Sequence, residues 1–230
     1  MKRIILFFAV LAVCSGFVGQ AQAEEGWHKG FYVQGNIGMT QVNNDTHLVT
    51  NVEFAKKTEL SYGLTLGWDV NDWIGPFFTA IYSTATSTVG TATGAAGAFP
   101  AATFPSESAR EHVADVTLGA RATLPYFIDA DWQPESIKFI PYAKLGGTAH
   151  GLFVNASTDA NKVGAFGGGP SLGAGIEAFI WKGLIVSVDF MEHLIFQKEF
   201  RRTIAGTDTA VTEGGFKPRF SVQAGLGWHF

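Results

Sequence analysis

The chain has 230 residues, of which 16% are charged and 13% aromatic, with 28 Gly and a formal net charge of −4. Soluble domains carry about 25% charged residues, so this composition is unusual for a soluble protein. The sequence has no basic stripe that would suit nucleic acid, and no run of about 18 apolar residues after its start that would span a membrane as a helix. Low charge and abundant Gly fit a barrel with lipid outside and a narrow interior.

The amino-terminal segment has the pattern of a cleaved secretory signal. Lys2 and Arg3 precede an apolar run over 4–13, and Ala21-Gln22-Ala23 is followed by two Glu. We expect a signal over 1–23, cleaved after Ala23, and a mature domain over 24–230. Cys14, the single cysteine, would leave with the signal. A lipid anchor at Cys14 is the alternative, but Val13 before it is larger than a lipobox usually accepts. The exported protein would then hold no disulfide and no thiolate metal site.

The first mature segments alternate between apolar and polar residues, the period of a strand with one apolar face. Segments 30–41 and 58–69 are predicted strands, and the second has an outward set of Leu60, Tyr62, Leu64, Leu66 and Trp68. A third strand is predicted over 73–87, but Phe77-Phe78 and Ile81-Tyr82 put bulk on both faces, so the sequence does not assign its register. The segment 88–107 is rich in Ala, Gly, Thr and Pro, which predicts a long loop.

Four further strands are predicted over 108–124, 137–150, 167–181 and 184–197. Their outward sets contain no charged residue apart from Glu192 near the external rim, whereas their inward sets hold nearly every charge of the strands. Pro141 lacks a backbone donor, so we expect a local irregularity there. Lys182-Gly183 is predicted to form a two-residue hairpin turn.

The last eleven residues complete the set with the clearest alternation. Apolar residues occupy every second position: Phe220, Val222, Ala224, Leu226, Trp228 and Phe230. The connectors alternate between long (43–57, 88–107, 151–166, 198–214) and short (70–72, 182–183), with 125–136 as an intermediate exception. We therefore predict an all-β fold, an eight-stranded antiparallel up-and-down transmembrane β-barrel. A soluble β-sandwich or lipocalin-like barrel is the alternative, but it would bury the apolar set behind a glycine-rich face with few polar groups.

Tryptophan falls at one end of the predicted strands. If the amino terminus lies in the periplasm, all six residues lie at periplasmic ends or turns: Trp27, Trp68, Trp73, Trp132, Trp181 and Trp228. Trp prefers the headgroup level of a membrane because its ring is apolar and its N–H seeks a partner. The pattern predicts an aromatic girdle, with chance placement at strand ends as the alternative.

The inward charges predict an internal network. Side chains fill an eight-stranded barrel, and an unpaired buried charge would cost several kcal/mol, so the charges must pair with one another. We expect Lys144 and Arg121 to neutralise the acids in a lumenal charge network of Asp115, Arg121, Lys144, Glu177 and Asp189. A gated ion path is the alternative function of the same residues.

The mature chain resembles the small OmpA-like and OmpX-like outer-membrane barrels. The residues that carry the resemblance are Gly30-Phe31-Tyr32-Val33, Ile140-Pro141-Tyr142 before a Gly-Gly strand, the Gly-rich strand over 167–181, and the terminal Phe230. The resemblance implies location in the cell outer membrane among lipid and lipopolysaccharide. It also implies that the barrel-assembly machinery reads the terminal strand as an insertion signal. Because the chain ends at Phe230, the peptidoglycan-binding domain of OmpA is not implied.

The resemblance identifies architecture better than activity. It implies a monomeric structural barrel whose external loops bind surfaces, host molecules or phage. A narrow pore or carrier for small or apolar solutes, as in OmpW-like barrels, is the alternative. A lipid A-modifying enzyme would need His and Ser at the external rim, where the sequence offers His112, His150, His193, Ser108 and Ser157. No His-x-Ser grouping accompanies these residues and the His spacing is irregular, so we expect no enzyme, no cofactor and no metal.

Overall fold

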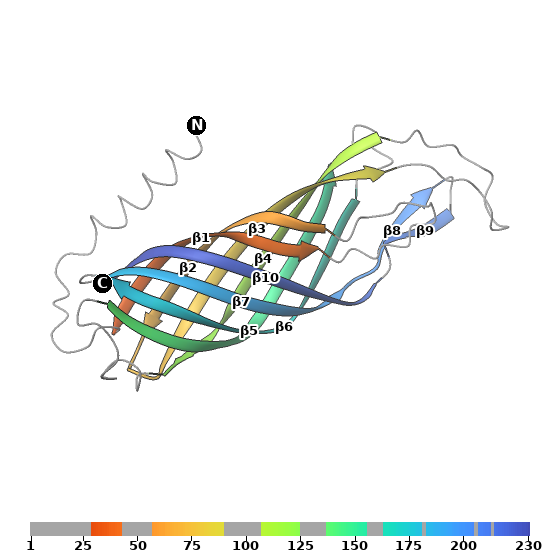
Figure 1. The fold of residues 1–230 in the computed structure, drawn as a ribbon. Helices are drawn as coiled ribbons and strands as arrows, with labels where there is room; N and C mark the ends of the chain where they lie inside the picture. Colours follow the sequence, from red (N-terminus) through yellow and green to blue (C-terminus); the bar gives the residue numbers. More distant parts are fainter. Residues whose placement is uncertain are drawn as a thin grey trace.

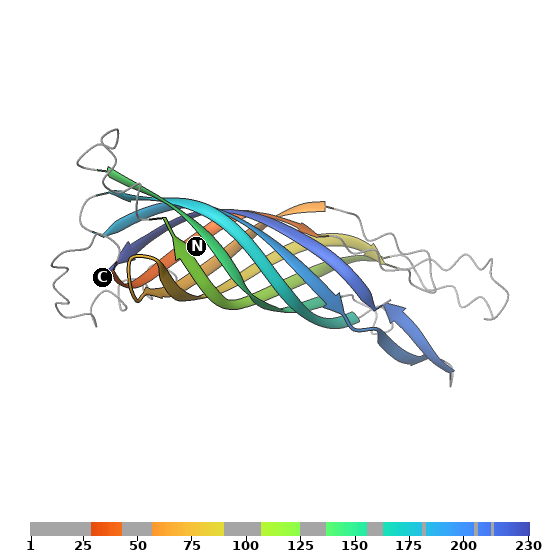
Figure 2. The ribbon, with the colours of Figure 1, turned by 90° about the horizontal axis from the view of Figure 1, so that it is seen from below.

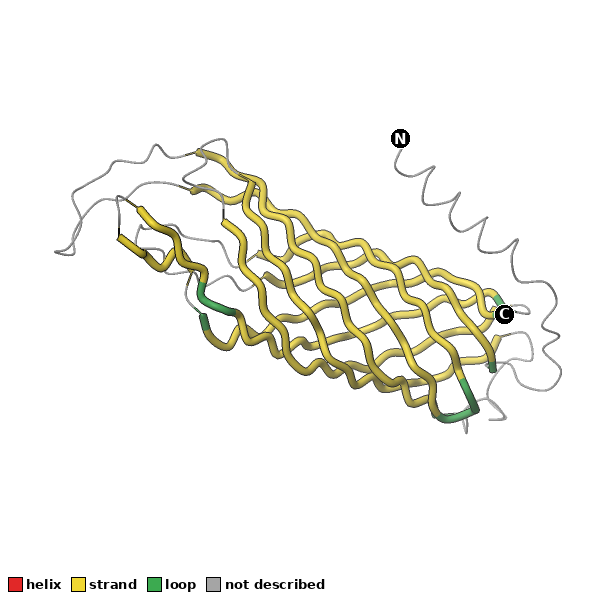
Figure 3. Tube along the Cα trace, turned by 180° about the vertical axis from the view of Figure 1, so that it is seen from behind, coloured by secondary structure: helices red, strands yellow, loops and turns green. Residues whose placement is uncertain are grey.

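The alternating segments form antiparallel strands that close on themselves. In the computed structural model the described residues are 29–42, 57–89, 107–124, 137–155, 163–180, 183–204, 207–212 and 214–230. The barrel strands are β1 (Gly30–Val42), β2 (Lys57–Asp69), β3 (Ile74–Val89), β4 (Glu107–Thr123), β5 (Ile137–Asn155), β6 (Val163–Ile180), β7 (Leu184–Gln197) and β10 (Gly215–His229). They are paired in the order β1-β10-β7-β6-β5-β4-β3-β2 and run obliquely around the barrel (Figures 1 and 3). The predicted eight-stranded antiparallel barrel is confirmed.

The apolar side chains face outward. Leu145 is 67% exposed and Leu226 58%, whereas the inward Thr65 and Ser187 are 1% and 2% exposed. This is the reverse of a soluble barrel, and it removes the soluble alternative, because a water-facing surface would not carry so continuous an apolar belt. Among the residues that the structure describes, no helix is long and apolar enough to span a membrane.

Glycines on the inner face make room for aromatic rings. Phe77 of β3 points inward and is 1% exposed, and its register partners on the two neighbouring strands are Gly67 and Gly119. A Cβ atom at Gly175 would lie 2.5 Å from Cζ of the inward Tyr142. The register of β3, unassigned from the sequence, places Phe77 inside the barrel between its two glycine partners, and Gly67 leaves room for the ring of Tyr32.

The two ends of the barrel differ. The carboxyl terminus and the start of β1 lie at one end, here called the terminal end (Figure 1). At the opposite end, here called the loop end, β8 (Phe200–Ile204) and β9 (Thr207–Thr212) form a separate two-stranded sheet beyond the barrel (Figures 1 and 2). The predicted loop over 198–214 is thus partly a hairpin. The predicted loop over 151–166 is also shorter, because β5 continues to Asn155 and β6 begins at Val163.

Two short features of the terminal end follow from local chemistry. Asn71 Oδ1 accepts hydrogen bonds at 2.9 Å from the N–H groups of Trp73 and Ile74, which fixes the β2–β3 turn. The irregularity predicted at Pro141 is wrong, because the β5–β6 register continues through it without a shift. The Pro141 carbonyl accepts from Leu124 N–H at 3.0 Å, so the edge without a donor faces β4 one position beyond its last register pair, Thr123 and Tyr142.

Candidate functional site

Ten of the buried ionisable side chains in the barrel interior, or lumen, form two groups and one pair. The group near the terminal end, called the Arg121 cluster, consists of Asp69, Arg121, Glu177 and His229. The group towards the loop end, called the Arg219 cluster, consists of Asp115, His150, His193 and Arg219. Lys144 and Asp189 form a pair between the two groups. All ten side chains are 6% exposed or less. Charges this deeply buried must be compensated inside the protein.

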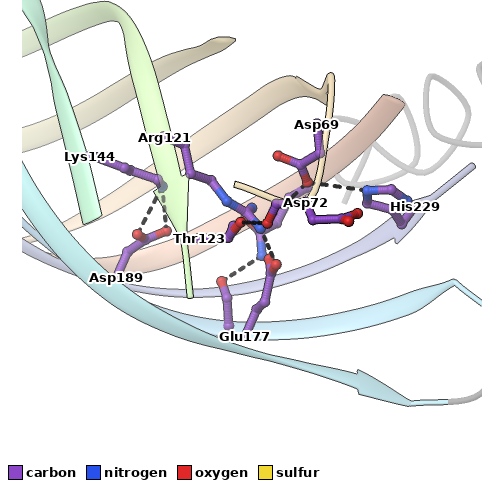
Figure 4. A network of polar contacts seen from close by, with 10 residues as sticks. Asp69, Asp72, Arg121, Thr123, Lys144, Glu177, Asp189 and His229 are labelled. Atoms are coloured by element: carbon purple, nitrogen blue, oxygen red, sulfur yellow. Dashed lines mark hydrogen bonds and ion pairs between the residues drawn. The ribbon is translucent and has the colours of Figure 1, made fainter. Parts of the chain in front are cut away.

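Arg121 is the centre of the first cluster. Its Nη2 contacts Glu177 Oε1 and lies 3.5 Å from Asp69 Oδ2, and His229 Nε2 lies 3.3 Å from the same Asp69 oxygen (Figure 4). The guanidinium also lies over the rings of Tyr32 and Tyr142, with 5.0 and 4.6 Å to their centroids. Two carboxylates and two π faces thus surround one buried cation.

The Lys144–Asp189 pair lies beside this cluster. Lys144 Nζ donates to both carboxylate oxygens of Asp189, at 2.8 and 2.9 Å (Figure 4). In the β4–β5 register Lys144 lies directly opposite Arg121, a like-charge arrangement that is unfavourable unless acids separate the two cations. Tyr142 also lies within cation–π distance of both cations, 5.0 Å from Nζ of Lys144. Glu177 and Asp189, from β6 and β7, each neutralise one of them.

The Arg219 cluster spans the lumen between opposite walls. Asp115 on β4 lies 2.6 Å from His150 Nδ1 and, across the lumen, 3.4 Å from Nη1 of Arg219 on β10. Thr148 Oγ1 on β5 lies 3.0 Å from His193 Nδ1 on β7. The Asp115–His150 contact follows the wall between the adjacent strands β4 and β5, whereas the Asp115–Arg219 and Thr148–His193 contacts join non-adjacent strands and bridge the interior.

An apolar group fills the terminal end of the lumen. Tyr32, Ile140, Phe179 and Ile185 come from four different strands, form one buried cluster and are 1% exposed or less. The His229 ring packs against two of them, stacked on Tyr32 at 5.9 Å and edge-on to Phe179 at 5.5 Å between centroids. This end of the lumen therefore contains a packed group of apolar and aromatic side chains.

The structure separates the predicted charge network into two parts. It brings Arg121 to Glu177 and Lys144 to Asp189, while Asp115 lies with Arg219 and His150 in the other cluster. Sequence reasoning omitted Arg219, although it continues the inward parity of Ser221 and Gln223 by one more step. Asp69 and His229 were also omitted from the predicted network. Their inward parity was readable, but their proximity to Arg121 depends on the closure of the barrel.

Three of the six tryptophans of the predicted girdle, and the whole terminal strand, lie among the described residues. Trp68 and Trp73 are 59% and 46% exposed at the terminal end, where Trp228 is half-buried, while Trp27, Trp132 and Trp181 lie outside the described residues. In the terminal strand β10, Phe220, Val222 and Leu226 are exposed on the outer face. Phe230 N–H donates to the Phe31 carbonyl at 2.8 Å, and the two rings stack at 6.2 Å. The last residue is thus joined to the first strand.

The histidines of the enzyme alternative do not converge. His112 lies on the outer face, with Nδ1 2.5 Å from Tyr82 Oη, whereas His150 and His193 lie inside the lumen. Ser157 and the Ser108 side chain lie outside what the structure describes. Within the described part of the chain, no three His, Cys, Asp or Glu residues are arranged to hold a metal ion.

Comparisons with known proteins agree with this architecture. A family model described as outer membrane protein beta-barrel domain matches residues 8–230. The fold is similar to Neisserial surface protein A, with a TM-score of 0.54 and 12% identity over 90% of this chain and 100% of that one. It is also similar to the outer membrane protein OprG from Pseudomonas aeruginosa, with a TM-score of 0.52 and 12% identity over 88% and 98% of the two chains. The outer membrane protein AlkL gives 0.50 and 11% over 93% and 96%. No curated protein sequence matches the chain.

Proposed function

Since the chain belongs to the outer membrane protein beta-barrel family, we propose that it is an integral outer-membrane scaffold with a closed lumen and interacting external loops. Family membership implies location in the outer membrane. Export through a signal over 1–23, removed after Ala23, is part of the proposal. In this orientation the terminal end faces the periplasm and the loop end faces outward, as expected when short turns are periplasmic.

The observation that supports a closed lumen is the set of buried side chains that lie inside the barrel. Within the described strands, the apolar group, the Arg121 cluster and the Lys144–Asp189 pair occupy successive levels of the lumen. Opening a path for solutes would require separating at least one buried ion pair, and separated charges in such a site cost several kcal/mol. A stable closed interior leaves the outer surface and the external loops as the parts that contact other molecules.

The proposed partners follow from the outer surface. The exposed apolar belt would contact outer-membrane lipid and lipopolysaccharide, and the barrel-assembly machinery would recognise β10 with its terminal Phe230. Barrel closure supports a monomer, because a closed barrel has no free strand edge through which to pair with a second copy. Nucleic acid is not a proposed partner, in view of the net charge of −4. We propose no catalytic role, since the candidate His residues lie on opposite sides of the barrel wall.

A narrow pore is the second candidate. It is favoured by the polar lining at mid-height, where Thr65 and Thr79 hydroxyls lie 3.0 Å apart and Thr117 and Thr148 hydroxyls 2.7 Å apart. A path through this level would pass the Lys144–Asp189 pair. The two candidates therefore differ in one property, whether the interior conducts ions.

Planar-bilayer recording of the refolded protein separates them. A scaffold predicts no discrete openings in wild type, and Lys144→Met should create or enlarge a conductance, because it frees Asp189 and removes one side of the closure. The control is Glu192→Gln, since Glu192 belongs to the outward parity and pairs with Leu172 and Phe220 on the outer face. Regular openings in wild type that Lys144→Met or Glu177→Gln abolish would replace the scaffold with the pore.

A further inference from the structure

Arg219 is the buried cation with the poorest set of partners. It is the largest of the fully buried side chains and is 2% exposed. It projects from β10 into the half of the lumen nearer the loop end, here called the outer half. Arg121, equally buried, has two carboxylates and two aromatic faces around it. Arg219 has one carboxylate, Asp115, at 3.4 Å, which His150 shares.

The contacts of His150 show that Arg219 has few hydrogen-bond acceptors. His150 Nδ1 lies 2.6 Å from Asp115 Oδ1 and 2.8 Å from Arg219 Nη1. A carboxylate only accepts hydrogen bonds, so Nδ1 must carry the proton and donate it to Asp115. It then has no lone pair for the Arg219 N–H. The 2.8 Å contact at Nδ1 is therefore not a hydrogen bond, and Nη1 of Arg219 keeps two long contacts, to His150 Nε2 at 3.4 Å and to Asp115 Oδ2 at 3.4 Å.

The other edge of the guanidinium carries two hydrogen-bond donors without a partner. Among the described residues, Nε and Nη2 of Arg219 have no hydrogen-bond partner. These two N–H groups are parallel and form the fork that matches the two oxygens of a carboxylate. His193 is the register partner of both Arg219 and Ser171, and His193 Nε2, Ser171 Oγ and Ser221 Oγ are also buried without partners. Glu111, the other buried acid of this half, has an interaction partner of its own.

We propose that the outer half of the lumen contains a binding site for a small carboxylate, held bidentately by Nε and Nη2 of Arg219 and flanked by His193, Ser171 and Ser221. A carboxylate here supplies the acceptor that this buried guanidinium lacks, since a desolvated charge is stable only when its hydrogen bonds are made. The planar fork selects a planar carboxylate over a spherical anion such as chloride. The site goes beyond the proposed scaffold role, because it does not depend on whether the lumen conducts.

The test is a site-resolved titration. The ¹⁵N-labelled protein is refolded in detergent micelles, and the Nε–H signal of Arg219, assigned through Arg219→Lys, is followed as sodium acetate replaces sodium chloride at constant ionic strength. We expect a saturable shift of this signal with acetate. Binding to the folded state alone also predicts a rise in the apparent unfolding temperature, on the order of a few degrees at saturation.

Two variants make the result specific. Arg219→Lys keeps the charge but removes the fork, so the acetate-dependent stabilisation should disappear. Lys217→Gln removes a charge two positions along the same strand and should leave the acetate response unchanged. An Arg219 signal that does not respond to acetate in wild type, or responds equally to chloride, would overturn the proposal even if a variant fails to fold. Equal stabilisation by acetate in Arg219→Lys would do the same.

Discussion

Arg121 shows how a buried charge constrains its neighbours. It lies opposite Lys144 across the β4–β5 ladder, and both cations lie near the ring of Tyr142. Two like charges at this separation are tolerated only because Glu177 and Asp189 each neutralise one of them. The four side chains therefore act as a unit, and removing one charge leaves another uncompensated in a site without water contact.

Replacement of Glu177 tests this dependence. Glu177→Gln keeps the shape and one acceptor oxygen but leaves Arg121 with Asp69 at 3.5 Å as its remaining carboxylate. We expect a loss of about 3 kcal/mol in the free energy of unfolding, as for breaking other buried pairs. Urea titration of the protein in lipid vesicles, followed by tryptophan fluorescence, measures it. Asp72→Asn is the matched control. It removes an acid from an exposed pair with Lys29 (3.2 Å, side chains 43% and 48% exposed), which contributes about 1 kcal/mol or less. Equal stabilities of the two variants would contradict a structural role for the cluster.

At the scale of the strand, alternation in the sequence predicts which residues face outward, but not in every strand. Segment 58–69 alternates strictly, and β2 exposes Leu60, Tyr62 and Trp68 as its sequence predicts. In β3 the adjacent Phe77 and Phe78 face opposite sides, and the sequence of the strand does not decide which of the two rings faces inward. The register partners of the inward Phe77 are Gly67 and Gly119, which lie on the neighbouring strands, 10 and 42 positions away in the chain. A strand whose packing space is supplied by its neighbours cannot be oriented from its own residues.

The outward-facing positions of the strands are predicted to contact lipid and not water. Nitroxide labels introduced at Leu64 and Val188, on the outer faces of β2 and β7, should be accessible to oxygen and protected from a water-soluble nickel complex in lipid vesicles. A label at Val70, 59% exposed in the turn after β2, is the control and should favour the nickel complex. Cys14, the one cysteine of the chain, would leave with the proposed signal, so each label would stand alone. Preferential nickel access at Val188 would place water where the fold requires acyl chains.

At the scale of the whole molecule, barrel closure brings together residues that no local pattern relates. Asp115 and Arg219 lie on opposite walls, 104 positions apart in the chain, and Gln34 donates to Ser187 across the intervening β10 at 2.5 Å. Inward parity predicted that such residues are buried, but not which partner each meets. The partner is decided by the strand order and by the stagger of the closed barrel. The sequence therefore predicts the composition of the lumen better than its pairing, as the separation of Asp115 from Lys144 shows.

Removal of the β8–β9 hairpin tests whether the stability of the barrel depends on this external element. It forms its own two-stranded sheet, and β7 already pairs with β10 at Gln197 and Gly215, so the barrel ladder is complete without it. Replacing residues 199–213 with Asn-Gly would join Lys198 to Gly214 through a tight hairpin turn. We expect the shortened chain to refold with the gel mobility of a folded barrel and with an unfolding free energy within about 1 kcal/mol of wild type, since surface loops away from a core change stability little. The Glu177→Gln variant, measured alongside, shows that the assay detects a weakened barrel. A large loss of stability on excision would mean that the hairpin stabilises the loop end and is not an independent external element.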